Sequence, residues 1–113
     1  MAEHDCRNGA LIDFSPAAAA EFTAIDKTTA RMWGKIQAER YMAFLDNIFA
    51  ELANDPHLGK PATGHPGIRI YIAKFRKRRN AHGHRILYRQ IDGGIRIIRI
   101  LHTAMHWPDH LGD

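Results

Sequence analysis

The residues best able to carry chemistry in this chain lie in its last third. Cleavage of RNA through its own 2′-hydroxyl requires a general base, a general acid and cations that stabilise the charged phosphorane. His102 could act as base or acid and Tyr88 as a proton donor, while Arg89 and Arg99 could clamp the phosphate. On regular strands, however, Tyr88 and Arg89 point to opposite faces, as do Arg99 and His102. Such a site therefore requires a strand end that twists or bulges.

Other catalytic and ligand-binding patterns in the sequence are weak. The four-residue spacing of His102, His106 and His110 is compatible with a zinc site on a helix. Pro108 interrupts such a helix, and no carboxylate or cysteine completes the set at ligand spacing. Neither a glycine-rich phosphate loop nor a Ser-His-Asp order stands out. We therefore expect no metal, no cofactor and no small-molecule substrate.

Composition indicates a globular protein with a basic C-terminal half. The 113 residues are 45% hydrophobic and 25% charged, and the single Cys6 excludes an internal disulfide. No apolar run approaches ~18 residues, and the N-terminus lacks a signal-peptide core. Residues 1–60 hold 6 Lys/Arg and 9 Asp/Glu (net −3), whereas residues 61–113 hold 10 and 3 (net +7). We expect one cytoplasmic domain over residues 1–113 without membrane contact, a disordered segment at residues 1–10, and an acidic partner.

Periodicity and turn residues predict the elements that position these side chains. Residues 10–16 alternate as a strand, and Ser15 followed by Pro16 predicts a helix start. A first helix ends at Gly34, and a second helix folds back on it as a hairpin. The remaining ranges are the second helix, a loop and three strands: 35–56, 57–67, 68–75, 84–91 and 95–102. The order βααβββ predicts an α+β fold with an N-terminal strand and a helical hairpin packed on one face of an antiparallel sheet.

The strand at residues 95–102 is predicted to be central, because both of its alternating faces carry apolar residues. Regular alternation gives two faces: Ile95, Ile97, Arg99 and Leu101 on one, and Arg96, Ile98, Ile100 and His102 on the other. The helical hairpin can cover only one of them. An exposed apolar face rimmed by arginine usually marks a binding groove. We therefore expect Arg96, Ile98 and Ile100 to bind a protein partner.

A series of motifs occurs in a fixed order between about residues 11 and 111: "FSPAAAAEF", "WG", "YMAFLDNIFAELANDPHLGKP", "GIR", "HRILYR" and "DGGIRIIRILH". This ordered set resembles the ParE toxins of the RelE/ParE superfamily, the toxin halves of type II toxin–antitoxin pairs. The resemblance implies that the protein inhibits DNA gyrase, either free or bound to DNA. It also implies neutralisation by a cognate antitoxin whose C-terminal segment wraps over the toxin. On this interpretation the protein is a binding inhibitor rather than an enzyme.

Two alternatives to gyrase inhibition remain open. The RelE branch of the superfamily cleaves mRNA in the ribosome, and that activity would use Tyr88, Arg89, Arg99 and His102. The chain could also be a toxin-derived protein that has lost its activity. It departs from the family pattern in the long basic stretch "RKRRNAHG", and after "ILH", where the family often carries an arginine and this chain has "TAMH".

The basic turn at residues 76–83 and the C-terminal tail are the candidate target-binding segments. Five of the sixteen basic residues of the chain lie between residues 74 and 79. Such a turn suits DNA phosphates or the carboxylates of a protein, although a solvated loop that protects a sheet edge has the same composition. The predicted target-binding residues are Arg76, Lys77, Arg78, Arg79, His106 and Trp107. Trp33, beside Gly34, is expected to pack between the two helices.

Overall fold

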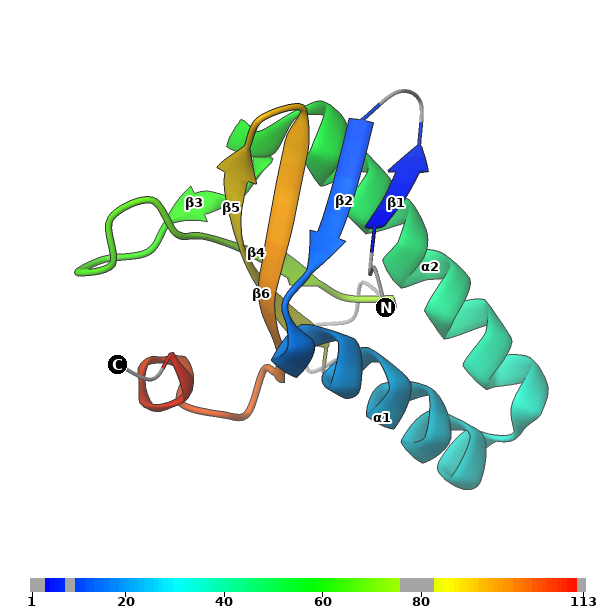
Figure 1. The fold of residues 1–113 in the computed structure, drawn as a ribbon. Helices are drawn as coiled ribbons and strands as arrows, with labels where there is room; N and C mark the ends of the chain where they lie inside the picture. The colour runs from blue at the N-terminus through cyan, green and yellow to red at the C-terminus, as the bar shows by residue number, and fades with distance from the viewer. Residues whose placement is uncertain (1–3, 8–9, 76–82, 112–113) are drawn as a thin grey trace.

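Figure 1 shows the computed structural model of the protein, which describes residues 4–7, 10–75 and 83–111. The predicted α+β class and the order of a strand, two helices and further strands are confirmed. No helix in these described ranges is long and apolar enough to cross a membrane. The elements in chain order are β1 (His4–Arg7), β2 (Ala10–Phe14), α1 (Pro16–Trp33), α2 (Lys35–Asn54), the 3₁₀ helix η1 (Pro56–Leu58), β3 (Lys60–Pro61), β4 (Arg69–Ala73), β5 (His84–Ile91), β6 (Gly94–His102) and the 3₁₀ helix η2 (Trp107–His110).

The strands form one sheet in the order β1-β2-β6-β5-β4-β3, with both helices on one face (Figure 1). β6 lies between β2 and β5, which confirms its predicted central position. The hairpin of β5 and β6 turns at Asp92 and Gly93, and Gly93 has a φ of 82°. The prediction of a wholly antiparallel sheet is wrong in one pairing, because β2 runs parallel to β6. The long connection between these two strands, which includes both helices, permits a parallel neighbour.

Two short strands lie where the sequence analysis predicts none. The segment 1–10, expected to be disordered, contains β1, whose residues pair antiparallel with β2 from His4↔Asp13 to Arg7↔Ala10. The predicted loop at 57–67 contains β3, which pairs with β4 at the far edge of the sheet. Strands of two to four residues are too short for their alternation to distinguish them from loops.

The helical hairpin begins and turns at the predicted residues. Ser15 Oγ accepts a hydrogen bond of 3.0 Å from Ala18 N, and Pro16 is the first residue of α1. Gly34 connects α1 to α2 with a φ of 92°, a conformation that residues with a side chain rarely adopt. Because only this residue separates the two helices, they fold back on each other as an antiparallel pair.

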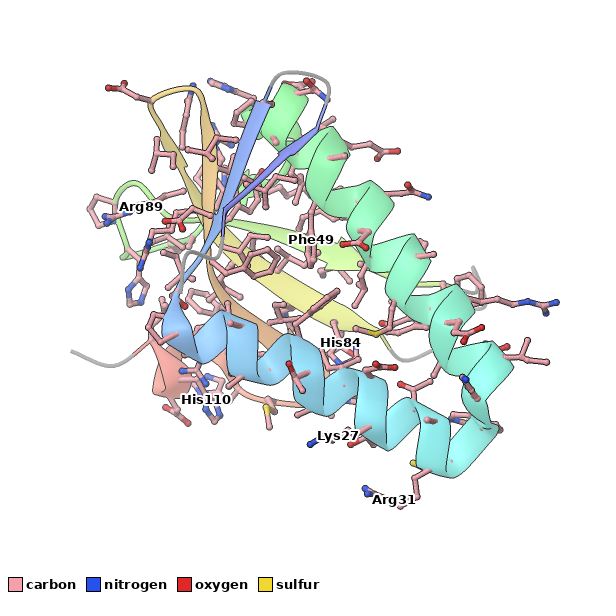
Figure 2. The ribbon with its side chains drawn as sticks, turned by 45° about the vertical axis from the view of Figure 1, so that its right-hand side comes forward. Lys27, Arg31, Phe49, His84, Arg89 and His110 are labelled. Carbon is pink, nitrogen blue, oxygen red and sulfur yellow. The ribbon has the colours of Figure 1, made fainter. Side chains whose placement is uncertain are left out.

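The core lies between the helical hairpin and the sheet, as the position of Phe49 in Figure 2 shows. Phe49 of α2 meets Phe14 of β2 edge to face, with ring centroids 5.4 Å apart, and lies 5.6 Å from Phe22 of α1. The sheet contributes fully buried side chains from three strands: Ile12, Ile86, Tyr88, Ile95 and Ile97. Burying a side chain of this size contributes about 1.5–3 kcal/mol. Apolar burial therefore fixes which face of each strand points to the helices.

A β-bulge in β6 changes which of its side chains face the core. Two residues of β5, Leu87 and Tyr88, oppose residues 97–99 of β6, so Ile98 is the additional residue. Beyond the bulge Ile100 returns to the helix-covered face, where it belongs to the core and is 3% exposed. The predicted placement of Ile100 on the same face as Ile98 is therefore wrong. Regular alternation does not continue across a bulge.

Candidate functional site

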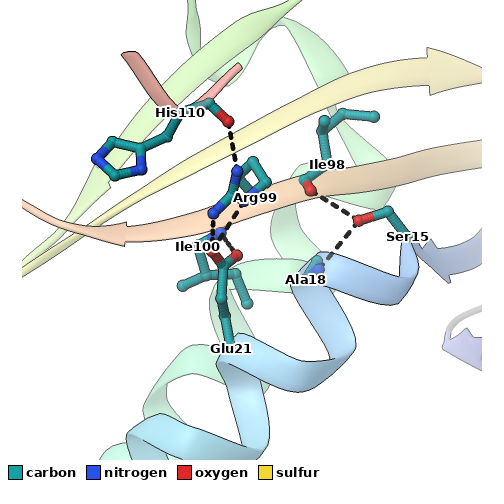
Figure 3. A network of polar contacts seen from close by, with 7 residues as sticks. All are labelled: Ser15, Ala18, Glu21, Ile98, Arg99, Ile100 and His110. Atoms are coloured by element: carbon teal, nitrogen blue, oxygen red, sulfur yellow. Dashed lines mark hydrogen bonds and ion pairs between the residues drawn. The ribbon is translucent and has the colours of Figure 1, made fainter. Parts of the chain in front are cut away.

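Where β2 ends, the start of α1 takes over hydrogen bonding to the edge of β6. Ser15 N donates to Ile97 O at 2.9 Å, and Ser15 Oγ donates to Ile98 O at 2.7 Å. Further along α1, Glu21 Oε1 accepts a hydrogen bond of 2.8 Å from Ile100 N (Figure 3). Ser15 and Glu21 therefore supply hydrogen bonds to the edge of β6 that β2 leaves unpaired, and they hold the bulge against α1.

Arg99, predicted as a phosphate clamp, is engaged by two other parts of the chain. Its Nε donates to Glu21 Oε2 at 2.8 Å, and its Nη1 donates to the carbonyl oxygen of His110 (Figure 3). The side chains of Arg99 and Glu21 are 25% and 21% exposed, so water screens this ion pair only in part. Arg99 thus joins α1, β6 and the C-terminal segment in a structural role.

The C-terminal segment, residues 103–111, lies against the face of the sheet opposite the helices, which we call the second face. Arg85 of β5 donates from Nη1 to Thr103 O at 2.8 Å and to Met105 O at 3.2 Å. Thr103 N also donates to Gly83 O at 2.9 Å, so the segment is anchored to the start of β5. Ile86 of β5 belongs to the core, and neighbouring residues of a strand point to opposite faces, so Arg85 lies on the second face.

The same segment meets the loop between β3 and β4. The Trp107 ring lies 5.4 Å from the ring of His65. Leu87 and Leu101, which alternation places on the second face, are buried although they lie outside the helix-covered core. We infer that the C-terminal segment and this loop cover them. The chain itself therefore covers part of the face that the sequence analysis leaves open.

The accessible part of the second face combines apolar residues with arginines. Ile70 and Ile98 are half-buried and flank Leu87 across three adjacent strands. Arg89 and Arg96 are paired in the register of β5 and β6. Figure 2 shows Arg89 on the side of the sheet away from the helices. This area has the composition expected of a protein-binding surface, with an aliphatic centre and a guanidinium rim.

The two arginines of this surface differ in their electrostatic partners. Arg96 forms an ion pair with Asp13 of β2, and its side chain is 33% exposed. Arg89 is exposed and forms no ion pair with any residue that the structure describes. Arg89 is therefore the better placed of the two to bind a carboxylate on another molecule.

Of the predicted partner-binding residues, the structure brings Arg96 and Ile98 together on the second face and places Ile100 in the core. Arg89 belongs beside Arg96, although the sequence analysis considers it only as a phosphate clamp. The adjacent hairpin pairing could have located it, since residues 89 and 96 lie at similar distances from the Asp-Gly-Gly turn.

The four residues of the nuclease alternative lie in different environments. Tyr88 is fully buried; its hydroxyl donates to Pro56 O at 2.7 Å and accepts from Gly59 N at 2.8 Å. Burial raises the pKa of Tyr88. Arg89 lies on the second face, Arg99 binds Glu21, and His102 packs its ring 5.5 Å from that of His84. The bulge in β6 does not gather these groups around one position.

We predict that Tyr88→Phe lowers the free energy of unfolding by about 1–3 kcal/mol, because it leaves the buried Gly59 N–H without its acceptor. Urea unfolding of the two proteins measures the difference. Tyr71→Phe is the matched control, since Tyr71 is only half-buried in the neighbouring strand. Equal stability of wild type and Tyr88→Phe would contradict the structural role of this hydroxyl.

His84 occupies an unusual position between the sheet and α2. Its Nδ1 lies 2.6 Å from the hydroxyl of Tyr41, and its ring meets the ring of His102 edge to face. Burial, together with the charge that His102 can carry, lowers the pKa of His84 to about 4. Burial raises the pKa of Tyr41 to about 12, so the tyrosine hydroxyl keeps its proton and donates a hydrogen bond to Nδ1 of the neutral imidazole.

We predict that acid destabilises the protein through His84. Its pKa in the folded state lies below the ordinary 6.5, so the unfolded chain takes up the proton first. The contribution of His84 to stability is complete above about pH 6.5 and declines as the pH falls towards 4, by at most ~1.4 kcal/mol per pH unit. His84→Gln, which can still accept from Tyr41, should flatten this decline in urea unfolding curves. The exposed His57→Gln should not, and an unchanged decline in His84→Gln would exclude His84 as its source.

The predicted target-binding residues are only partly within the structure. Arg76, Lys77, Arg78 and Arg79 lie outside the described residues. His106 is exposed, with its Nδ1 3.1 Å from Asp109 Oδ2. Trp107 is half-buried against His65, so only part of its ring is available to another molecule. In the described ranges no group of three or more histidine, cysteine or acidic side chains is arranged to hold a metal ion.

The chain is similar to known proteins both in sequence and in fold. The family model described as the ParE toxin of the type II toxin–antitoxin system parDE matches residues 12–107. A solved structure from the chromosomal ParDE system of P. aeruginosa is 21% identical in sequence, with a TM-score of 0.61. The alignment covers 80% of this chain and 91% of that chain. At this identity the likeness shows a shared fold. No curated protein matches the chain.

Proposed function

The chain belongs to the ParE toxin family of type II toxin–antitoxin systems, and from this premise we propose that it inhibits DNA gyrase in the cytoplasm until a cognate antitoxin neutralises it. We further propose that the whole chain acts as one toxin domain. The antitoxin binds the accessible part of the second face, through Ile98, Arg96 and Arg89. The half-buried isoleucine and the two guanidinium groups suit a segment that carries both apolar and acidic side chains.

The observation that carries the choice of a binding inhibitor over a nuclease is the position of Tyr88. A proton donor must reach the leaving oxygen of the substrate, whereas this hydroxyl is buried and bound to Pro56 and Gly59. Arg99, a candidate cation for the phosphorane, is already bound to Glu21. This arrangement supports inhibition by binding, without cleavage of nucleic acid.

An assay of supercoiling by purified gyrase tests the proposal. The isolated toxin is expected to block supercoiling of relaxed plasmid, and equimolar antitoxin is expected to restore it. In a reconstituted translation reaction the mRNA is expected to stay intact. Specific mRNA cleavage at the ribosomal A site would replace this proposal with the RelE-like activity. A chain that affects neither reaction and does not arrest growth would instead be a toxin-derived protein without activity.

The basic turn and the C-terminal tail remain proposed target contacts. We predict that changing Arg76, Lys77, Arg78 and Arg79 to Gln reduces growth inhibition while altering the free energy of unfolding by less than about 0.5 kcal/mol. Each lost charge contact should also flatten the salt dependence of target binding. The measurements are a thermal melt and a growth assay. A separate variant, with His106 and Trp107 changed to Ala, tests the C-terminal tail in the same two assays. Unchanged toxicity with an unchanged melting temperature would show that the turn is a solvated loop that makes no target contact.

A further inference from the structure

The turn of the helical hairpin carries large apolar side chains that the protein does not bury. We call residues 31–36, which are all exposed, the hairpin tip. Trp33 is 71% exposed, Ile36 67% and Met32 64%. The expectation that Trp33 packs between the helices is wrong. More than half of each of these side chains is therefore in contact with water and available to a partner.

The fold explains why the hairpin tip stays outside the core. The packed part of α1 ends near Ile25, and the first buried residue of α2 is Ala38. Both helices continue past the sheet to the turn at Gly34 (Figure 1). The last turn of α1 and the first turn of α2 therefore have no sheet beneath them. The result is a convex projection on the helix-covered side, whereas Ile98 and Arg89 lie on the second face.

Cations surround the apolar side chains of the hairpin tip. Between residues 26 and 40 the sequence contains Lys27, Arg31, Lys35 and Arg40 against two acids, Asp26 and Glu39. Figure 2 shows Lys27 and Arg31 extending from the same side of α1, away from the body of the protein. Neither they nor Lys35 form an ion pair with a residue in the described ranges. A partner's carboxylates can therefore approach them without displacing an internal contact.

We infer that the hairpin tip inserts into an apolar pocket rimmed by carboxylates on the toxin's target protein. This inference rests on the proposed function and adds a further target contact, on a surface separate from the antitoxin site. Tryptophan, methionine and arginine are enriched in the centres of protein–protein interfaces. A convex shape with an aliphatic and aromatic summit requires a concave apolar site, and the unpaired cations require acidic residues around it.

Two other kinds of partner fit the hairpin tip less well. Two copies of the tip would bring Lys27, Arg31 and Lys35 of each chain close to those of the other, and this repulsion disfavours a dimer. Nucleic acid could stack a base on Trp33 and bind phosphates with the cations, but it offers no apolar pocket for Met32 and Ile36. An acidic protein pocket accounts for all six side chains.

The experiment compares surface variants in three assays. The apolar variant is Trp33→Ser with Ile36→Ser, and the charge variant is Arg31→Glu with Lys35→Glu. Leu58→Ser is the matched control, because Leu58 is also an exposed large apolar residue, 46% exposed, but lies at the other end of α2. Inhibition of gyrase supercoiling, affinity for the antitoxin and thermal stability are measured for each purified protein.

The apolar variant is expected to lose about 30-fold or more in inhibitory potency, the scale of a buried interface residue, with antitoxin affinity and melting unchanged. The charge variant should lose potency most at low salt. Leu58→Ser should match wild type. Equal potency of the apolar variant and wild type overturns the inference, as does a parallel loss of antitoxin affinity. Binding of wild type to a DNA fragment alone, lost in both tip variants, assigns the tip to nucleic acid and also overturns it.

A growth assay separates failure of this inference from failure of the proposed function. If wild type arrests growth without inhibiting gyrase, the gyrase proposal fails. The inference then holds only if the apolar variant no longer arrests growth while Leu58→Ser still does. If both variants arrest growth, the hairpin tip has no role in target binding. A wild type that neither inhibits gyrase nor arrests growth overturns both.

Discussion

Ile98→Asp is expected to weaken antitoxin binding by ~100-fold or more in a protein that still folds, whereas Ile100→Asp, two residues further on, is expected to prevent folding. Ile98 is the additional residue of the bulge and is half-buried on the second face. An aspartate there remains in contact with water and lies near Arg89 and Arg96. It removes an apolar contact and repels an acidic antitoxin segment, and a hot-spot residue of this kind is worth about 2–4 kcal/mol.

Ile100 faces the opposite side of the same strand. It belongs to the core beneath the helices, is 3% exposed and packs among apolar side chains. An uncompensated charge in such a position costs more than about 4 kcal/mol, a large part of the stability of a domain of this size.

Circular dichroism and titration of labelled antitoxin peptide measure the two effects. Ile98→Val, which keeps the apolar surface, should bind within about threefold of wild type, as expected for the loss of one methylene. Normal antitoxin affinity in a folded Ile98→Asp protein would show that the antitoxin binds elsewhere. A stable, folded Ile100→Asp protein would show that the face assignment across the bulge is incorrect.

This contrast also shows what alternation in the sequence can and cannot predict. The apolar character of residues 95–102 correctly predicts a central strand, and the Asp-Gly-Gly turn predicts its antiparallel partner. The bulge has no signal of its own, because neither glycine nor proline marks Ile98. Its cause is tertiary: Ser15 and Glu21, more than 75 residues earlier in the chain, hold the strand edge where β2 ends.

The candidate site could be predicted only in part for the same reason. Arg96 precedes the bulge and Ile98 lies in it, so the predicted face of these two residues is correct. Ile100 follows the bulge and therefore faces the core instead. The fold-back of residues 103–111 depends on single side-chain contacts, such as Arg85 with Thr103 O, which periodicity does not report. The exposure of Trp33 depends on how far the helices extend past the sheet. Helical spacing identifies one face of a helix but not the point at which its packing partner ends.

Glu21 should be the polar side chain whose loss destabilises this region most. Its carboxylate accepts hydrogen bonds from Ile100 N and from the guanidinium of Arg99. Glu21→Ala leaves both donors without this acceptor in a partly buried setting, where the side chain of Arg99 is 25% exposed. We predict a loss of about 3 kcal/mol in the free energy of unfolding, between the value for a lost neutral hydrogen bond and that for a broken fully buried ion pair.

Urea unfolding of three variants tests this prediction. Glu21→Gln keeps an oxygen acceptor for Ile100 N but loses the charge and the second acceptor oxygen, which receives the hydrogen bonds from Arg99. It should therefore lose about 1–2 kcal/mol, less than Glu21→Ala. Glu51→Ala, at an exposed acid of α2, should change the stability by less than about 0.5 kcal/mol. If Glu21→Ala also lost no more than this, the contacts of Glu21 would be replaced by water. A large loss of stability in Glu21→Ala, accompanied by faster hydrogen exchange at Ile100 N, would show that the structure is disrupted at the bulge. The antitoxin affinity of Glu21→Ala would then be expected to fall as well, because Ile98 would no longer be held in one position on the second face.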